Sequence, residues 1–324
     1  MAARLSEATW GVWPAFRIEG GSLSAVVVPA VGGRVVSLRD RRDGREWLTQ
    51  GAPPDLDGAA SWGREDAIFS GRESFGWDEC LPTVAPCADP LEPGAPPLRD
   101  HGDQWGRPTR TTLEPAAGAL TTTWAGSRWP YQLERRLSVE AGSALRVDYA
   151  LTSFAEVPLP ILWSMHPALA LEPGSVVELP GVQQMRLAWA RGLPIVAGDS
   201  VSWPTATAPD ASNIDLGRVR PADGSAAKLY ALAPLVARVV ASDGAALELT
   251  WDPLIPALGL WLSFGGWPPD GPPVEQVALE PTSSPDDHLA DALAHDRAWV
   301  VSARGSLRWW VRISCRPAAG ESTR

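Results

Sequence analysis

The chain has 324 residues, of which 45% are hydrophobic and 20% are charged, a balance typical of a globular protein with a large buried core. Its formal net charge of -10 argues against a nucleic-acid partner, because binding to phosphates requires clustered Lys and Arg. Neither the N-terminus nor any later segment offers the long apolar run of a signal peptide or membrane span, so we expect no membrane association and a cytoplasmic location.

Apolar and polar residues alternate along much of the chain, which is typical of half-buried β-strands. Clear examples lie at residues 145–151, 247–251 and 307–313. Asp-Gly pairs at 43–44 and 243–244 are typical of hairpin turns. The sequence therefore predicts a predominantly antiparallel β architecture, either a sandwich or a barrel.

Evidence for helices is sparse, because 32 prolines and 30 glycines are scattered along the chain. The best candidate begins at Ser284, which can cap a helix, and Pro285, which fits the first helical position. Two carboxylates and an apolar face follow, so a short helix is predicted near 285–294. No repeat or linker divides the chain, and we predict one domain over residues 1–324.

Two of the four histidines occur in motifs that contain tryptophan, DHGDQWGR at 100–107 and WSMHPAL at 163–169. Histidine can donate and accept protons near neutral pH, which makes His101 and His166 candidates for acid-base chemistry. Glu280, in VALEPTSS, is a third candidate, since partial burial would raise its pKa and make it a stronger base. The alternative is a structural role for each: a half-buried histidine, or a carboxylate that binds a backbone amide at a strand end.

Tryptophan is unusually frequent, with 17 Trp against three Tyr and five Phe. Most of these rings are expected in the core, where wide side chains pack between sheets. Four lie beside polar motifs and are candidates to stack on the apolar face of a sugar ring, with a core position as the alternative: Trp77, Trp105, Trp163 and Trp261.

The carboxylates of Asp78 and Glu79, in GWDE, are further candidates, either as acceptors for sugar hydroxyls or as exposed turn residues. A metal site made of His101, Asp103 and His166 is conceivable from the ligand types. However, the H-x-D spacing is common and the third ligand is remote, so we expect no metal and no cofactor. Three irregularly spaced cysteines are too few for a disulfide framework.

Five short motifs follow one another along the chain: GGR at 32–34, GWDE at 76–79, HG with a following arginine at 101–107, WSMHP at 163–167 and LEP at 279–281. In order, spacing and β-rich context the set resembles the aldose 1-epimerase, or galactose mutarotase-like, family. The resemblance extends over nearly the whole chain. It implies an all-β fold, a large antiparallel β-sandwich of the galactose mutarotase-like supersandwich type with few short helices. It also implies that a sugar binds in an open cleft on one concave sheet.

The resemblance further implies roles for individual residues. His166 would be the general acid that protonates the ring oxygen, and Glu280 the general base that takes the proton of the anomeric hydroxyl. The ring then opens, the free aldehyde rotates, and closure gives the other anomer. His101 would bind the sugar and stabilise charge, with Arg107 as a second ligand.

The chain departs from the family's pattern at two places. An aromatic residue is usual after the proline of the second histidine motif, but Ala168 follows Pro167 here. A sugar-binding aspartate is usual between that histidine and the glutamate, and none stands here in a recognisable motif. Asp252, in TWDP, or Asp78 could replace it. Both departures concern which sugar is bound.

We therefore predict a carbohydrate mutarotase, an isomerase that acts on a free or phosphorylated aldose as its small-molecule partner. The alternatives are a non-catalytic carbohydrate-binding protein on the same fold, and a lyase or hydrolase, which would require two carboxylates or a tyrosine base across a glycosidic bond. Retention of both His166 and Glu280 favours the enzyme. The predicted substrate contacts are His101, Arg107, Asp78, Trp77, Trp105 and Trp261.

Overall fold

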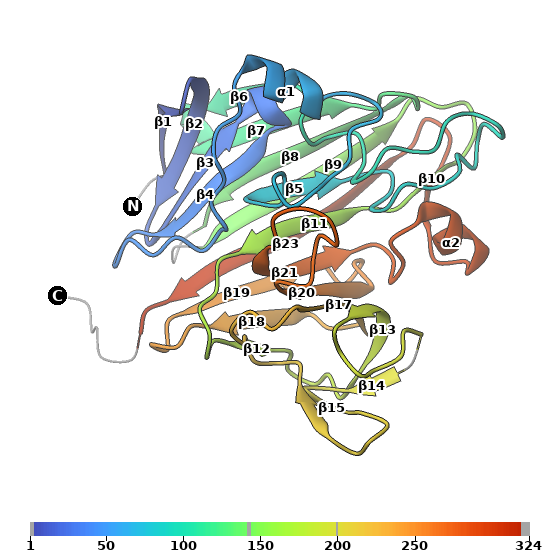
Figure 1. Ribbon diagram of the computed structural model, residues 1–324. Helices are drawn as coiled ribbons and strands as arrows, with labels where there is room; N and C mark the ends of the chain where they lie inside the picture. Colours follow the sequence, from blue (N-terminus) through green and yellow to red (C-terminus); the bar gives the residue numbers. More distant parts are fainter. Residues whose placement is uncertain (1–2, 141–143, 199, 319–324) are drawn as a thin grey trace.

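Antiparallel strands build two large sheets in the computed structural model, which describes residues 3–140, 144–198 and 200–318 (Figure 1). In spatial order, the larger sheet contains β1 (Arg4–Trp10), β2 (Trp13–Gly20), β3 (Leu23–Val28), β4 (Arg34–Asp40), β5 (Trp77–Cys80), β11 (Ser164–Leu169), β21 (Glu275–Thr282), β20 (Ala257–Phe264), β17 (Ser225–Leu232), β13 (Gln184–Arg191) and β14 (Ser200–Ser202). The smaller sheet contains β12 (Val176–Glu178), β18 (Val236–Val240), β19 (Ala246–Trp251), β23 (Ser306–Arg316), β9 (Leu145–Ser153), β8 (Tyr131–Val139), β7 (Ala119–Ala125) and β6 (Arg110–Glu114).

The remaining elements are short. Two further strand pairs join β10 (Leu159–Ile161) to β22 (Trp299–Val301) and β15 (Thr205–Thr207) to β16 (Asn213–Asp215). The helices are α1 (Leu56–Trp62), α2 (Leu289–Ala294) and single 3-10 turns at Pro29–Val31 and Pro115–Ala117. No helix within the described ranges has the length and hydropathy needed to cross a membrane.

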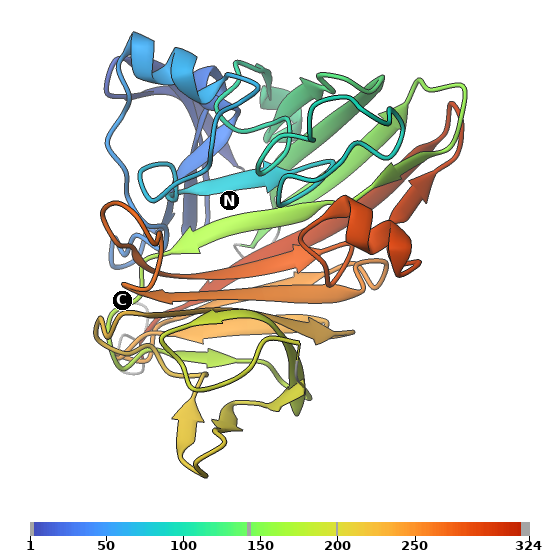
Figure 2. The ribbon, with the colours of Figure 1, turned by 45° about the vertical axis from the view of Figure 1, so that its right-hand side comes forward.

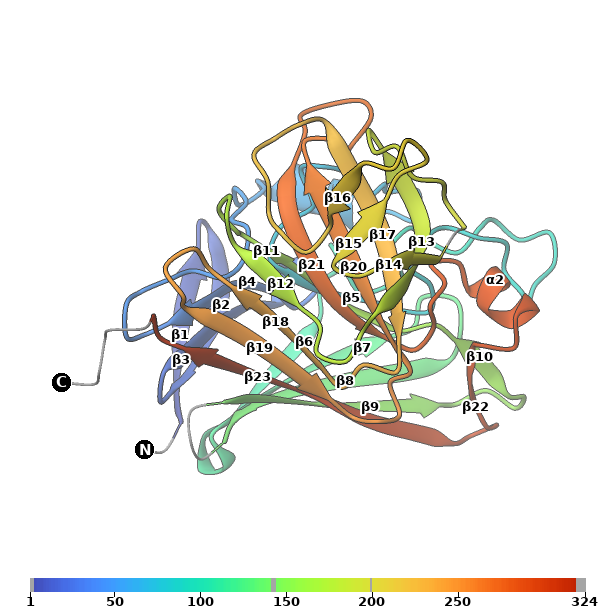
Figure 3. The same ribbon diagram turned by 90° about the horizontal axis from the view of Figure 1, so that it is seen from below.

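The predicted all-β antiparallel sandwich is confirmed, and the three strands expected from alternation are β9, β19 and β23. They are neighbours in the smaller sheet, and their apolar residues face the larger sheet across a shared core. Seen from below, these strands lie in one layer and β17, β20 and β21 in the other (Figure 3). The Asp-Gly pair at 243–244 forms the predicted hairpin between β18 and β19.

The helix predicted at 285–294 begins later than expected, at Leu289, so its first four residues were assigned wrongly. The Asp287 carbonyl accepts the backbone N–H groups of Val84 and Ala85, and this holds the chain non-helical up to that point. The side chain of Ser284 bonds to Asp286 instead of capping a helix.

The central strands of the larger sheet are buried on both faces. In β11 every residue is buried, and in β21 all but the first are, so these strands lack the alternation of a half-exposed strand. One face packs on the smaller sheet. Loops cover part of the other, including the segment after β5 and the segment that leads into α2, which lie at the same end of the molecule (Figure 2).

A buried ion pair links the two sheets. Arg135 of β8 contacts Glu79 of β5 at 3.2 Å, and both side chains are fully buried. Glu79 also accepts hydrogen bonds from Trp77, Tyr149 and Trp163. Burial nevertheless raises the pKa of Glu79 to about 7, because the carboxylate has lost its water. Arg135 therefore compensates the charge in the middle of the core.

Replacing Arg135 by Met should destabilise the fold by about 3–5 kcal/mol, because it leaves the Glu79 carboxylate buried without a cation. The loss should grow as the pH rises above about 7, the pKa of Glu79 in the wild type, since the folded wild type then releases a proton that the folded variant must keep. Chemical denaturation at several pH values measures both effects. Arg136→Met is the matched control, because Arg136 lies on the half-exposed side of the same strand. Equal losses in the two variants would contradict this prediction.

Candidate functional site

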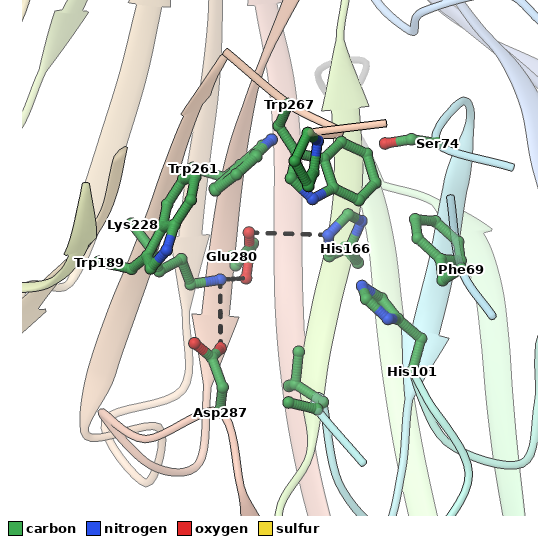
Figure 4. A pocket seen from close by; sticks show the side chains of 13 residues that line it. Phe69, Ser74, His101, His166, Trp189, Lys228, Trp261, Trp267, Glu280 and Asp287 are labelled. Carbon is green, nitrogen blue, oxygen red and sulfur yellow. Dashed lines mark hydrogen bonds and ion pairs between the residues drawn. The ribbon is translucent and has the colours of Figure 1, made fainter. Parts of the chain in front are cut away.

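A pocket of about 340 Å³ lies on the face of the larger sheet that is turned away from the core. Its floor is built by β11, β21, β20 and β17, and its rim by the covering loops (Figure 4). The lining divides into a polar group, consisting of Ser74, His101, His166, Lys228, Glu280 and Asp287, and an apolar group, consisting of Phe69, Val84, Ala85, Trp189, Trp261, Trp267 and Pro269.

His166 and Glu280 face each other at the centre of the pocket floor. They project from the neighbouring strands β11 and β21, and the distance from His166 Nε2 to Glu280 Oε1 is 3.8 Å (Figure 4). Glu280 is only 1% exposed. Its Oε1 accepts no hydrogen bond from the described residues, although buried polar atoms are nearly always paired. Oε1 is therefore a free acceptor directed at this pocket.

The surroundings shift the pKa values of His166 and Glu280 in opposite directions. Burial raises the pKa of Glu280, while the Lys228 ammonium opposes that rise. Burial lowers the pKa of His166 well below its ordinary value, and the neighbouring His101 and Lys228 lower it further. In ordinary surroundings histidine holds a proton more tightly than glutamate does. Both shifts act against that ordinary order, because His166 holds its proton less tightly and Glu280 holds its proton more tightly.

The backbone at His101 has an unusual conformation. Its φ is 55°, in the left-handed region that residues other than glycine rarely occupy. The next residue, Gly102, has φ 77°, and a Cβ there would lie only 2.3 Å from the carbonyl oxygen of Leu81. The HG motif is therefore required by a tight turn against Leu81, the residue that follows β5, and this turn directs His101 into the pocket.

The imidazole of His101 is held on three sides. Its Nδ1 bonds to the Asp100 carboxylate at 2.8 Å, and its ring stacks on Phe69 with centroids 4.0 Å apart. The ring of His166 lies 5.2 Å away. Trp105 is fully buried behind this turn, where its Nε1 donates to the Asp100 carbonyl at 2.6 Å. The prediction that Trp105 stacks on a sugar is corrected: it supports the His101 turn.

Sequence reasoning missed Lys228 and Asp287. Lys228, on β17, is the only lysine of the chain beside 27 arginines, which is a compositional signal that could have identified it. It is buried and pairs with Glu280, and its Nζ lies 3.5 Å from Asp287 Oδ1. The Tyr230 hydroxyl donates to the same Asp287 oxygen. Asp287 is thus the second carboxylate of the pocket, and it follows Glu280 in sequence instead of preceding it.

Three tryptophans form one wall of the pocket. Trp189 and Trp261 stack with centroids 5.7 Å apart, and Trp267 meets Trp261 edge-on at 5.8 Å. Trp261 therefore lines the pocket, as its predicted stacking role requires. The other two belong to β13 and to the loop after β20, and their sequence surroundings carry no polar motif.

Three predicted contacts lie elsewhere. Trp77 is fully buried in the core, as is Trp163, so neither ring offers a face to a ligand. Asp78 lies beside His166 on the neighbouring strand, but it forms a buried pair with Arg34 at 2.6 Å. Arg107 binds the surface residue Glu65 outside the pocket. The prediction that Trp77, Asp78 and Arg107 contact a sugar directly is therefore corrected.

The two remaining aspartates also lie outside the pocket lining. Asp103 accepts hydrogen bonds from Ser127 and Tyr131, which turns it away from the two histidines. Asp252 caps a turn by accepting the N–H of Leu254. Over the described ranges, no group of three or more His, Cys, Asp or Glu is placed to hold a metal ion.

No protein-family model and no curated protein sequence matched the chain. Solved structures do match over nearly the full length. A galactose mutarotase-like protein from Lactobacillus casei has a TM-score of 0.64 at 17% identity, and the match covers 93% of this chain and 100% of that one. Another galactose mutarotase-like protein, from Clostridium acetobutylicum, has a TM-score of 0.65 at 12% identity, and the match covers 97% of this chain and 99% of that one. A candidate aldose 1-epimerase from Escherichia coli K12 has a TM-score of 0.65 at 14% identity, again with 97% of this chain and 99% of that one covered. The chain therefore has the fold of the aldose 1-epimerase and galactose mutarotase-like proteins.

Proposed function

We propose that this protein is a carbohydrate mutarotase in which His166 and Glu280 move protons at the anomeric centre. The observation that carries the proposal is the free Glu280 Oε1, which faces His166 Nε2 across 3.8 Å at the floor of the pocket. The ring oxygen and the anomeric hydroxyl of a sugar are bonded to the same carbon. An acid and a base placed side by side can therefore reach both oxygens at once.

In the proposed reaction the His166–Glu280 pair holds one proton throughout. Ring opening transfers the anomeric hydroxyl proton to Glu280 Oε1 while protonated His166 gives its proton to the ring oxygen. Rotation about the bond to the aldehyde carbon exposes its other face, and closure reverses both transfers. The pair ends as it began, which suits two groups whose pKa values have shifted toward each other.

The other groups of the pocket have supporting roles in this proposal. Because Asp100 binds Nδ1 of His101, the Nε2 of that ring is left to bind a sugar oxygen. The wall formed by Trp189, Trp261 and Trp267 offers aromatic faces to the C–H face of a pyranose.

The charges of the pocket favour an unphosphorylated aldose. Among the lining residues the one Lys or Arg is Lys228, and it is already paired with Glu280 and Asp287. A phosphate group would meet two carboxylates and no free ammonium or guanidinium group, whereas phosphate sites usually present Arg or Lys. Neutral sugars avoid that repulsion.

Polarimetry tests the proposal. Pure α anomers of neutral aldoses are dissolved, and the optical rotation is followed with and without protein. We expect faster relaxation to the same equilibrium for at least one neutral sugar, and no acceleration for its 6-phosphate. Binding of a sugar, detected by tryptophan fluorescence, without acceleration for any aldose would support the non-catalytic binding protein instead.

A further inference from the structure

Lys228 occupies a position that the proposed reaction does not itself explain. It extends from β17 toward Glu280 on β21, although β20 lies between these two strands. The residue of β20 next to Glu280 is Gly259, and a Cβ there would lie 3.1 Å from Glu280 Oε2 and 3.3 Å from Tyr230. The missing side chain at Gly259 thus leaves space for the carboxylate and its partners above the middle strand.

The two oxygens of Glu280 have different surroundings. Oε2 accepts a hydrogen bond from Lys228 Nζ, whereas Oε1 accepts none from the described residues and faces His166. Lys228 is held in turn by Asp287, which also accepts the Tyr230 hydroxyl. This series of side-chain contacts, from Tyr230 through Asp287 and Lys228 to Glu280, therefore holds the Glu280 carboxylate in one orientation.

We propose that Lys228 is a positioning residue that keeps Glu280 ionised and directs only Oε1 toward the substrate. This inference rests on the proposed mutarotase function, since it assigns how the base of that reaction is prepared. It does not give Lys228 a contact with the reacting atoms.

The electrostatics of the pocket agree with this role. Burial acts to raise the pKa of Glu280 and to lower that of Lys228, because each charge has lost its water. Mutual attraction opposes both shifts, and together with Asp287 it brings the pKa of Lys228 above its ordinary value. Lys228 is thus a permanent cation at neutral pH. Without it, the burial of Glu280 would be unopposed, and the carboxyl would keep its proton to higher pH.

The Lys228 ammonium also lowers the pKa of His166, Cys80 and Asp287, so its removal shifts these groups as well. Several ionisable groups besides Lys228 face Glu280. These are His166 from β11, Cys80 from β5, Tyr230 from β17, and His101 and Asp287 from the covering loops.

The test compares the pH dependence of kcat/KM in the wild type, K228M and K228R, with R308M as a control at an exposed cation of β23. In K228M the rise of activity on the acid side should move to higher pH, giving a loss of about tenfold or more at pH 6 that shrinks as the pH increases. K228R keeps the charge and should restore most of the acid-side activity. A profile in K228M that is only scaled down, with no displacement along the pH axis, would overturn the inference.

Infrared difference spectroscopy tests the same inference without using activity. The carboxylic acid band that E280Q removes identifies Glu280. The titration of this band should lie at higher pH in K228M, which lacks the cation, and should stay close to the wild-type position in K228R, which keeps it. If the wild type accelerates no mutarotation, the proposed function fails, yet an upward displacement of this titration in K228M still supports the role of Lys228. An unchanged titration in folded K228M or, if that variant does not fold, in K228Q contradicts it.

Discussion

Substitution of Glu280 by Gln should remove the catalysed mutarotation and leave sugar binding within a few-fold of the wild type. Glutamine keeps the size of the side chain and a carbonyl oxygen that can accept a hydrogen bond, but it cannot take the anomeric proton near neutral pH. General base catalysis typically contributes about 10²- to 10⁴-fold, so the remaining rate should approach that of the solvent. Lys228 keeps Asp287 as a counter-ion in the variant, which limits the structural damage.

Two measurements on the same samples check this expectation. Polarimetry gives the rate, and the fluorescence of the tryptophan wall gives the affinity. The control is Glu275→Gln, because Glu275 is the exposed first residue of the same strand, β21. An unchanged rate in Glu280→Gln, for a sugar that the wild type interconverts, contradicts the role of Glu280 as the base.

Mutarotation by the wild type should be fastest on the acidic side of neutrality and should fall as the pH increases. The productive form of the pair has one proton, with His166 protonated and Glu280 ionised. Burial lowers the pKa of His166 well below its ordinary value, so increasing pH removes this form from the free protein early. Falling pH removes it at the other end, because the raised pKa of Glu280 causes its carboxylate to be protonated sooner.

The pH profile of kcat/KM reports these groups in the free protein, as apparent values of the coupled pair. Substitution of His166 by Asn should remove the alkaline limb together with about 10²- to 10⁴-fold of the rate. The double variant with Glu280→Gln should be little slower than either single variant, since the two groups serve one step. Activity that increases steadily from pH 6 to pH 9 would be incompatible with His166 as the acid.

The sequence predicted the strands well, because alternation records which face of a strand is buried. It predicted poorly on which side of the sheet each side chain of the GWDE motif lies. In β5 successive side chains point to opposite faces, so Trp77 and Glu79 enter the core while Asp78 lies beside His166. A polar motif next to a tryptophan therefore does not place both residues in the same cavity.

The missed site residues share a physical reason. Lys228 reaches Glu280 from two strands away, and Asp287 is positioned by backbone bonds from the loop at 84–85. Neither relation leaves a local pattern in the sequence. His101, His166 and Glu280 could be singled out because each lies in a short motif, and the structure brings all three to one pocket.

Two-dimensional proton NMR exchange spectroscopy of the anomeric signals tests the central claim most directly, because it detects interconversion of the anomers at equilibrium without any coupled reaction. In a solution of a neutral aldose, we expect the wild type to produce exchange cross-peaks between the α and β anomeric protons at catalytic protein concentrations. Glu280→Gln should bind the same sugar and produce none beyond the solvent rate. Binding by the wild type with no exchange cross-peak for any aldose of a broad panel would contradict the account.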